Sequence, residues 1–274
     1  MKKIVALLYL YLNCLAALAQ QEGLIESSGS KLYYRIYGSG MPVVIINGGP
    51  GMNSDGFAAL AMELSTNNKA IIYDQRGTGK SIVQNPDNSA ITMDLMVQDM
   101  ENLRKHLHIN KWILRGHSFG GMLAAYYATV YPQNIQAIIL SSSGGINLGL
   151  LNYVGNAINA KLTAGEQQAV KYWTKKISEG DTTHYARLQR GMALAPAYLY
   201  NKKNIPVIAE RLTQGNATIN ELVWQNLNTI KFNCAPKLSA ALFPVLILQG
   251  KQDIVTEETA LQSRKALKIP TLFL

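Results

Sequence analysis

Short apolar runs alternate with amphipathic segments along the first half of the chain. Residues 31–37 (KLYYRIY) alternate polar and aromatic side chains, which is typical of a half-buried strand. Short continuous apolar runs are typical of strands that are buried on both faces. Such runs stand at residues 43–46, 70–73, 112–114 and 137–140.

Helical patterns lie between these runs, at residues 57–64, 92–107 and 119–131. In the second of them Met96, Met100 and Leu103 form one apolar stripe, and Thr92 suits the N-terminal cap. Alternating strands and helices predict right-handed βαβ units. We therefore expect an α/β fold with a mainly parallel central sheet and helices on both faces.

The alternation stops after residue 145 and returns near residue 241. Between these points the chain shows helices and polar turns, and the strand pattern resumes at residues 244–248. A helix at 257–267 and a strand at 271–274 follow. We expect one core built from residues 20–145 and 241–274, with residues 146–240 inserted as a helical cap. Aromatic side chains in this insert are expected mostly in the core of the cap, with one or two lining a pocket: Trp173, Tyr185, Tyr198, Tyr200 and Trp224.

The first 19 residues form a separate segment. Lys2 and Lys3 precede an apolar run, which ends in the small-x-small pattern Ala17-Leu18-Ala19. This predicts a signal peptide over residues 1–19 and export to the periplasm or the medium, with no membrane attachment after cleavage. An uncleaved anchor helix is one alternative. A lipid-modified Cys14 is another, although Asn13 fits that signal poorly.

The charge, the cysteine count and one near-miss motif argue against several classes of function. The net charge of +9 falls to +7 without Lys2 and Lys3, and the basic residues are scattered, so we expect no nucleic-acid partner. Cys234 is then the only cysteine, which excludes an internal disulfide. Gly79-Lys80-Ser81 resembles the end of a phosphate-binding loop, but Asp74 stands where that loop requires glycine. We expect neither a metal site nor a cofactor.

The segment Gly116–Gly121 (GHSFGG) matches G-x-S-x-G between a predicted strand and a predicted helix. This context is the one in which the motif forms a nucleophile elbow, with Ser118 exposed at the carboxyl edge of the sheet. Attack on a carbonyl creates an oxyanion, which two backbone N–H groups must stabilise. One is expected from Phe119 and the other from the glycine-rich loop 47–51 (NGGPG).

The sequence contains a candidate for the acid of a catalytic triad, but no histidine at the position expected for the base. Asp253 follows the strand at 244–248 and could orient a histidine above the same sheet edge; a turn aspartate is the alternative reading. Asp94 and Asp181 are weaker candidates, because neither follows a core strand. None of the four histidines comes after Asp253: His106, His108, His117 and His184. We expect the chain to be truncated and the base to lie beyond Leu274, with His184 as a weak surrogate.

Three segments, 47–51 (NGGPG), 74–81 (DQRGTGKS) and 116–121 (GHSFGG), together resemble the α/β-hydrolase superfamily and within it the proline iminopeptidase-like serine peptidases. The resemblance covers nearly everything after residue 19. It implies an α/β-hydrolase fold with Ser118 as nucleophile, Asp253 as acid, and Gly49 and Phe119 as oxyanion donors.

This chain departs from the resembling family at two points. Asn47 replaces a histidine, and the cap glutamates that hold a substrate's amino terminus have no clear counterpart among Glu179, Glu210 and Glu221. The expected function is prolyl aminopeptidase activity on short peptides. Hydrolysis of small esters or amides is the alternative. A non-catalytic ligand-binding protein is the alternative from another class, because the triad histidine is absent.

Overall fold

The computed structural model describes residues 20–268 and 270–273, with side chains described through residue 268. The predicted signal peptide therefore lies outside the described residues. One mixed sheet has the strand order β1-β2-β4-β3-β6-β7-β8-β9, with β5 paired to β2. The strands are β1 (Gln21–Ser27), β2 (Ser30–Tyr37), β3 (Met41–Ile46), β4 (Asn68–Tyr73), β5 (Ile82–Val83), β6 (Trp112–His117), β7 (Ile135–Ser141), β8 (Val245–Leu248) and β9 (Pro270–Phe273).

The predicted parallel sheet is confirmed for the strands that carry the apolar runs. Strands β3, β4, β6, β7, β8 and β9 are parallel to their neighbours in this group. The edge formed by β1, β2 and β5 is antiparallel. Strand β1 was not predicted, because most of its residues are polar or exposed, and β5 was not predicted, because two residues are too few to form a pattern. The polar start of β1 is possible at a sheet edge, where only one neighbour covers it.

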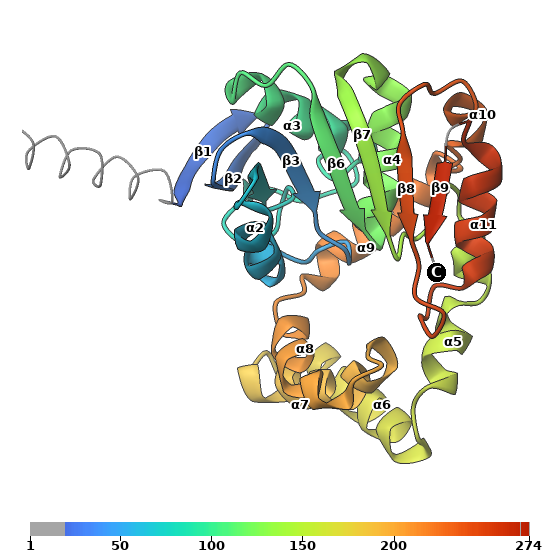
Figure 1. Cartoon of the computed structure of the whole chain (residues 1–274). Helices are drawn as coiled ribbons and strands as arrows, with labels where there is room; N and C mark the ends of the chain where they lie inside the picture. The colour runs from blue at the N-terminus through green and yellow to red at the C-terminus, as the bar shows by residue number, and fades with distance from the viewer. Residues whose placement is uncertain (1–19, 269, 274) are drawn as a thin grey trace, which may run out of the picture.

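Helices pack on both faces of the sheet (Figure 1). The structure contains α2 (Ala58–Leu64), α3 (Met93–His106), α4 (Phe119–Val130), α5 (Val154–Ala160), α6 (Ala164–Ser178), α7 (His184–Leu194), α8 (Ile205–Leu212), α9 (Ala217–Thr229), α10 (Ala235–Leu238) and α11 (Glu257–Ala266). On one face Ile45 and Ile72 pack with Phe57 and Ala61, at the start of α2 and within it. The main core fills the opposite face, under α3 and α4. The side chain of Thr92 caps α3 by accepting from Leu95 N at 3.2 Å, as predicted.

The insert between β7 and β8 divides into two parts by packing. Helices α5 to α8 lie away from the sheet in Figure 1 and share a small apolar cluster that includes Leu162 and Leu194. Helix α9, by contrast, places Ile219, Val223 and Leu227 in the main core. The predicted cap range of 146–240 therefore includes an α9–α10 segment that packs with the core. None of the helices formed by the described residues is long and apolar enough to cross a membrane.

Candidate active site

Ser118 occupies the sharp turn between β6 and α4. Its backbone has φ 51° and ψ −120°, outside the regions that L-residues usually adopt, and it is one of few non-glycine residues with positive φ. The Ser118 carbonyl accepts from Gly121 N at 2.9 Å and from Gly144 N at 3.0 Å, and these bonds hold the strained turn in place. This geometry is that of a nucleophile elbow, as the sequence predicts.

Gly120, two residues after the nucleophile, allows α4 to approach the sheet closely. A Cβ on Gly120 would lie 2.1 Å from the carbonyl oxygen of Ile46, at the end of neighbouring strand β3. No side chain fits at that distance, so a larger residue would push the start of α4 away from the sheet. The elbow therefore depends on glycine at this position through packing as well as through the turn.

The glycine-rich loop after β3 lies directly against the elbow. A Cβ on Gly48 would lie 2.7 Å from the Ser118 Cβ, so the two segments are in contact. The next residue, Gly49, has φ +68°. Phe119 N is the first N–H of α4, which no carbonyl of its own helix can satisfy. Among the described residues, neither Gly49 N nor Phe119 N donates a hydrogen bond to another group, so both are available to an oxyanion.

Asn47 shapes this loop from beneath. It is fully buried, and its Nδ2 donates to the carbonyl oxygen of Met52 at 2.8 Å, while Met52 N donates to Gly49 O at 3.0 Å. Gln75 Nε2 donates to the Asn47 carbonyl at 3.0 Å. The asparagine that replaces the family's histidine therefore closes the turn by hydrogen bonds of its own.

Helix α9 contacts the same loop from the side of the insert. Asn216 N donates to the carbonyl of Gly51 at 2.9 Å, and Asn220 Nδ2 donates to that of Pro50 at 2.8 Å. Sequence reasoning missed both residues. A single asparagine in a helical segment has no pattern that distinguishes a loop contact from a solvated position.

Asp253 lies in the loop that follows β8, at the carboxyl edge of the sheet. Its side chain is half-buried, and its Oδ1 accepts from Val255 N at 3.0 Å, which orients the carboxylate. Burial and two arginines lower the pKa of His117, the residue before the nucleophile, and the nearby negative charge of Asp253 acts in the opposite direction. The structure thus brings the predicted acid into the neighbourhood of the elbow. The weaker candidates are engaged elsewhere: Asp94 accepts from Tyr126 OH at 2.7 Å, and Asp181 accepts from Thr183 in an exposed turn.

None of the four histidines is placed to activate Ser118. His117 ends β6 with its Nδ1 3.1 Å from Ser141 O and its ring 5.5 Å from that of Phe57. His106 is exposed and contacts Tyr34 OH at 3.1 Å, and His108 is exposed. His184, the weak surrogate of the sequence analysis, has its Nε2 2.9 Å from Glu210 on the surface of α7 and α8, and it forms no hydrogen bond with Ser118 or Asp253.

The pKa of His117 is lowered from 6.5 to about 4, chiefly because burial disfavours its charged form and then because of Arg115 and Arg211 nearby. His117 is therefore neutral at pH 7. Between pH 6.5 and about 4 the unfolded chain binds a proton there that the folded chain does not. The free energy of unfolding should fall as the pH drops through this window. Urea unfolding at a series of pH values should show a smaller fall for His117→Gln than for the wild type.

His106→Gln is the matched control, because His106 is exposed and should leave the pH dependence as in the wild type. An equal fall in stability for His117→Gln and the wild type would show that His117 is not held neutral by the fold.

The three cap glutamates all lie at exposed positions. Glu179 forms an ion pair with Lys175 at 3.7 Å, Glu210 contacts His184, and Glu221 accepts from Gln225 at 3.1 Å. These contacts connect neighbouring turns or neighbouring helices on the surface. None of them places a carboxylate at Ser118.

The segment 74–81 (DQRGTGKS) is a structural support beside the site. Asp74 accepts from Ser54 N and Lys80 N, both at 2.8 Å, so its carboxylate closes the loop that resembles a phosphate-binding loop. Arg76 forms a fully buried, bidentate ion pair with Asp99 of α3, with both N···O distances 2.7 Å. These bonds join the loop after β4 to Ser54, which precedes α2, and to α3.

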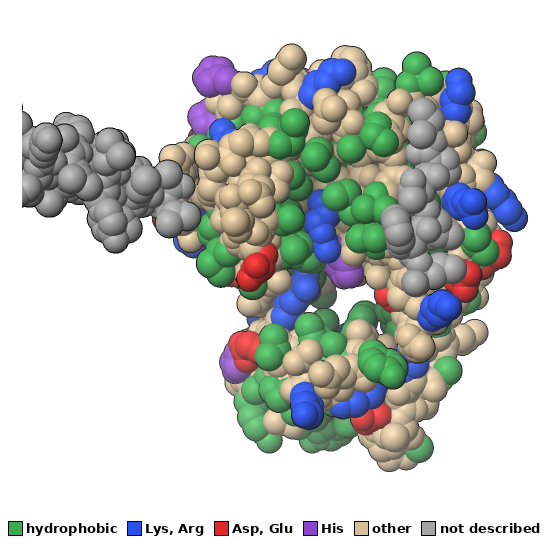
Figure 2. Space-filling model, in the orientation of Figure 1, with side chains coloured by type: hydrophobic (Ala, Val, Ile, Leu, Met, Phe, Trp, Pro, Cys, Tyr) green, Lys and Arg blue, Asp and Glu red, His purple; other side chains and the backbone are tan. Residues whose placement is uncertain are grey.

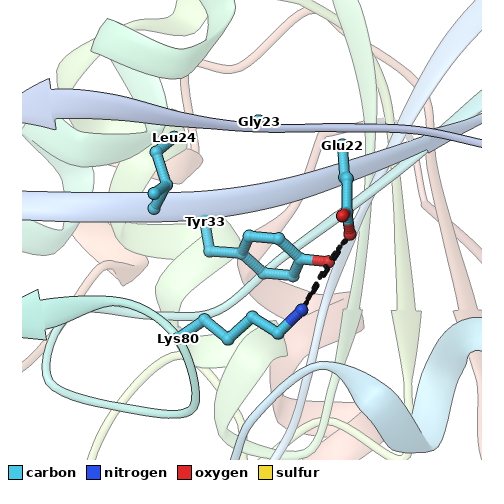
Figure 3. Close-up of a pocket in the computed structure, with 5 residues that line it drawn as sticks. All are labelled: Glu22, Gly23, Leu24, Tyr33 and Lys80. Carbon is cyan, nitrogen blue, oxygen red and sulfur yellow. Dashed lines mark hydrogen bonds and ion pairs between the residues drawn. The ribbon is translucent and has the colours of Figure 1, made fainter.

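Other features of the described residues offer no competing site. No group of three or more metal-ligating side chains occurs among residues 20–268. A hollow of about 330 Å³ lies at the β1–β2 edge, where the Tyr33 hydroxyl stands between Glu22 and Lys80 (Figure 3). It is shallow and open, and Tyr33 satisfies both charged neighbours, so it holds no reactive group.

The comparisons agree with this geometry. The family model described as alpha/beta hydrolase fold matches residues 41–272. The proline iminopeptidase of Lactobacillus crispatus is 39% identical over 252 residues, with 87% of this chain and 84% of that protein covered. The proline iminopeptidase of Saccharolobus solfataricus is 30% identical over 264 residues, with 90% and 82% covered.

Among solved structures, an alpha/beta fold family hydrolase from Bacillus anthracis has a TM-score of 0.73 at 19% identity, covering 93% of this chain and 90% of that one. At this identity the likeness shows the fold alone. Together with the sequence relatives it confirms the predicted fold class. The chain belongs to the α/β-hydrolase superfamily and is a relative of the proline iminopeptidases.

Proposed function

We propose that this protein is a serine hydrolase that removes an N-terminal prolyl or other small residue from short peptides, with Ser118 as the nucleophile. The observation that carries the proposal is the strained Ser118 at the start of α4, in contact with a loop that offers a second free N–H. The related proline iminopeptidases support a peptide substrate.

The reaction follows from the groups around Ser118. Its Oγ forms a bond to the substrate carbonyl carbon and gives its proton to a histidine. The N–H groups of Gly49 and Phe119 stabilise the tetrahedral oxyanion. The histidine then protonates the leaving amine as the C–N bond breaks, and water releases the acyl group by the same steps. The proposal needs neither a metal nor a cofactor.

The histidine in this scheme lies outside residues 1–274 in our proposal, because the four that this chain contains are engaged or exposed elsewhere. Asp253 orients it from the loop after β8. The natural coding sequence downstream of Leu274 tests this point: a histidine codon shortly after it would support the proposal. A stop codon directly after Leu274 would favour a non-catalytic binding protein.

Hydrolysis of small esters or amides is the second candidate. The observation that favours it is that none of the three cap glutamates lies at Ser118, where it could hold a substrate's free amino group. All three make contacts on the surface instead. The assay that separates the candidates compares L-prolyl arylamide, N-acetyl-L-prolyl arylamide and a p-nitrophenyl ester with the protein produced from its gene. We expect turnover of the free prolyl arylamide to exceed that of the blocked one.

Equal turnover of free and blocked arylamides, with faster ester cleavage, would favour the second candidate. No turnover of any substrate would favour the binding protein.

We also propose that the protein is exported, since Lys2, Lys3 and the apolar run before Gln20 have the pattern of a signal peptide. N-terminal sequencing of the protein from its native host should begin at Gln20. A mature protein that still starts at Met1 would contradict export by this signal.

A further inference from the structure

Two arginines from distant parts of the chain meet at one aromatic ring beside the elbow. Arg115 lies in β6 and Arg211 in α8, and their guanidinium carbons lie 5.6 Å and 4.5 Å from the ring centroid of Phe57. The Arg211 side chain is packed against the backbone here, because a Cβ on Gly56 would lie 2.4 Å from its Nε. Figure 2 shows basic side chains in the hollow between the sheet and helices α6 to α8.

Neither arginine has an anionic partner among residues 20–268. The nearby Asp55 is already held by Arg35 at 2.6 Å, and Glu210 contacts His184 at 2.9 Å. Arg115 reaches only the Ser141 hydroxyl, at 3.4 Å, and one of its terminal nitrogens is buried without a hydrogen-bond partner. Burial lowers the pKa of both guanidinium groups, with no carboxylate to oppose the effect.

This arrangement is costly without a ligand. Charges that lose water are normally paired, and an uncompensated one destabilises a fold. The ring of Phe57 stabilises the cations only partly, through cation–π contacts. A carboxylate matches what is missing, because its two oxygens accept paired N–H groups from the planar guanidinium fork.

The arginine pair lies close to the nucleophile. The ring of His117 is 5.5 Å from that of Phe57, and its Cδ2 would lie 3.0 Å from a Cβ on Gly48. That same Cβ would lie 2.7 Å from Ser118. Each residue of an extended peptide spans about 3.5 Å. A short peptide bound at Ser118 therefore spans a length comparable to this chain of contacts, which leads through His117 and Phe57 to the arginines.

We propose that Arg115 and Arg211 bind the C-terminal carboxylate of a di- or tripeptide whose scissile carbonyl is at Ser118. The inference rests on the proposed peptidase function and sharpens it, because it makes free short peptides the substrates and amidated peptides poor ones. A carboxylate at this point would also join the core to α8, since the two arginines come from opposite sides of the hollow.

The first test is binding to Ser118→Ala, which does not depend on turnover. Calorimetric titration with Pro-Ala and with Pro-Ala amide should show at least tenfold tighter binding of the free acid. Adding Arg211→Gln should weaken binding of the acid at least tenfold and leave the amide within about twofold; Arg115→Gln should act in the same direction. Arg190→Gln is the matched control, because Arg190 is a cap arginine that contacts Thr174 instead. It should leave the preference for the acid intact.

Equal binding of acid and amide to Ser118→Ala would overturn the inference, as would a preference that survives in both the Arg115→Gln and the Arg211→Gln variants. Kinetic measurements separate failure of the carboxylate site from failure of the proposed peptidase function. If the otherwise wild-type enzyme cleaves both peptides with equal kcat/KM, the peptidase stands and the carboxylate site does not. If the acid binds more tightly through the arginines but is not cleaved, the carboxylate site stands and the peptidase does not.

Discussion

Replacing Ser118 with alanine should abolish covalent labelling by a fluorophosphonate and lower kcat/KM by roughly 10⁴-fold or more, because the nucleophile is removed. The fold should be unchanged, since the hydrogen bonds that hold the turn are accepted by the Ser118 backbone carbonyl, which alanine retains. The measurement uses the protein as it is produced from its gene, with labelling followed by mass spectrometry and turnover of L-prolyl arylamide as the second readout.

Ser65→Ala is a suitable control, because Ser65 follows α2 on the surface and its hydroxyl bonds only within its own turn, to Met62 O. It should label and react as the wild type does. Labelling of the Ser118→Ala protein at an undiminished level would mean that the reactive residue lies elsewhere.

Replacing Asp253 with asparagine should lower kcat by about 10⁴-fold, since an amide cannot hold the histidine in the required tautomer or stabilise its protonated form. The effect should fall on kcat more than on KM, because the carboxylate contributes chiefly in the transition state. Asparagine retains an oxygen for the bond from Val255 N, so the loop after β8 should keep its structure. Steady-state kinetics with L-prolyl arylamide measures both parameters.

Asp181→Asn is the matched control for this prediction. Asp181 lies in an exposed turn, where it accepts from Thr183, and the same amide substitution there should leave kcat within about twofold. A large loss of kcat in Asp181→Asn with none in Asp253→Asn would reverse the assignment of the acid.

Local patterns predicted those parts of the fold whose physical cause is local. The apolar runs became β3, β4, β6 and β7, because a strand buried on both faces must be apolar throughout. The cap at Thr92 depends on a neighbour three residues away, and the motif around Ser118 is contiguous, so their sequence signals were sufficient, although Gly144 N also helps to hold the Ser118 turn. Strand β1 was missed because a polar edge strand is stabilised by its pairing with β2, which no local pattern reveals.

The candidate site also has one part that local sequence predicts and one part that depends on contacts between distant residues. The elbow and the glycine loop are short motifs, and their contact follows from the parallel order of β3 and β6, which places both carboxyl ends at one sheet edge. Arg115 carried no signal in the sequence, because the apolar run was read as residues 112–114 and a single arginine after it has no pattern that distinguishes it from a solvated residue. Its meaning depended on Phe57 and Arg211, which lie 58 and 96 residues away along the chain.

By itself, then, the sequence determined the alternation of core strands and helices and the family, and it located the proposed nucleophile and the glycine loop, because each is encoded in contiguous residues. Only the tertiary structure decided that α9 packs with the core, that Asn47 and Asn220 hold the loop, and that two arginines, without acidic partners among residues 20–268, meet beside the elbow. The physical reason is common to all three. Packing, hydrogen bonding and charge pairing act between side chains that are close in space, and the folded chain alone sets which of them meet.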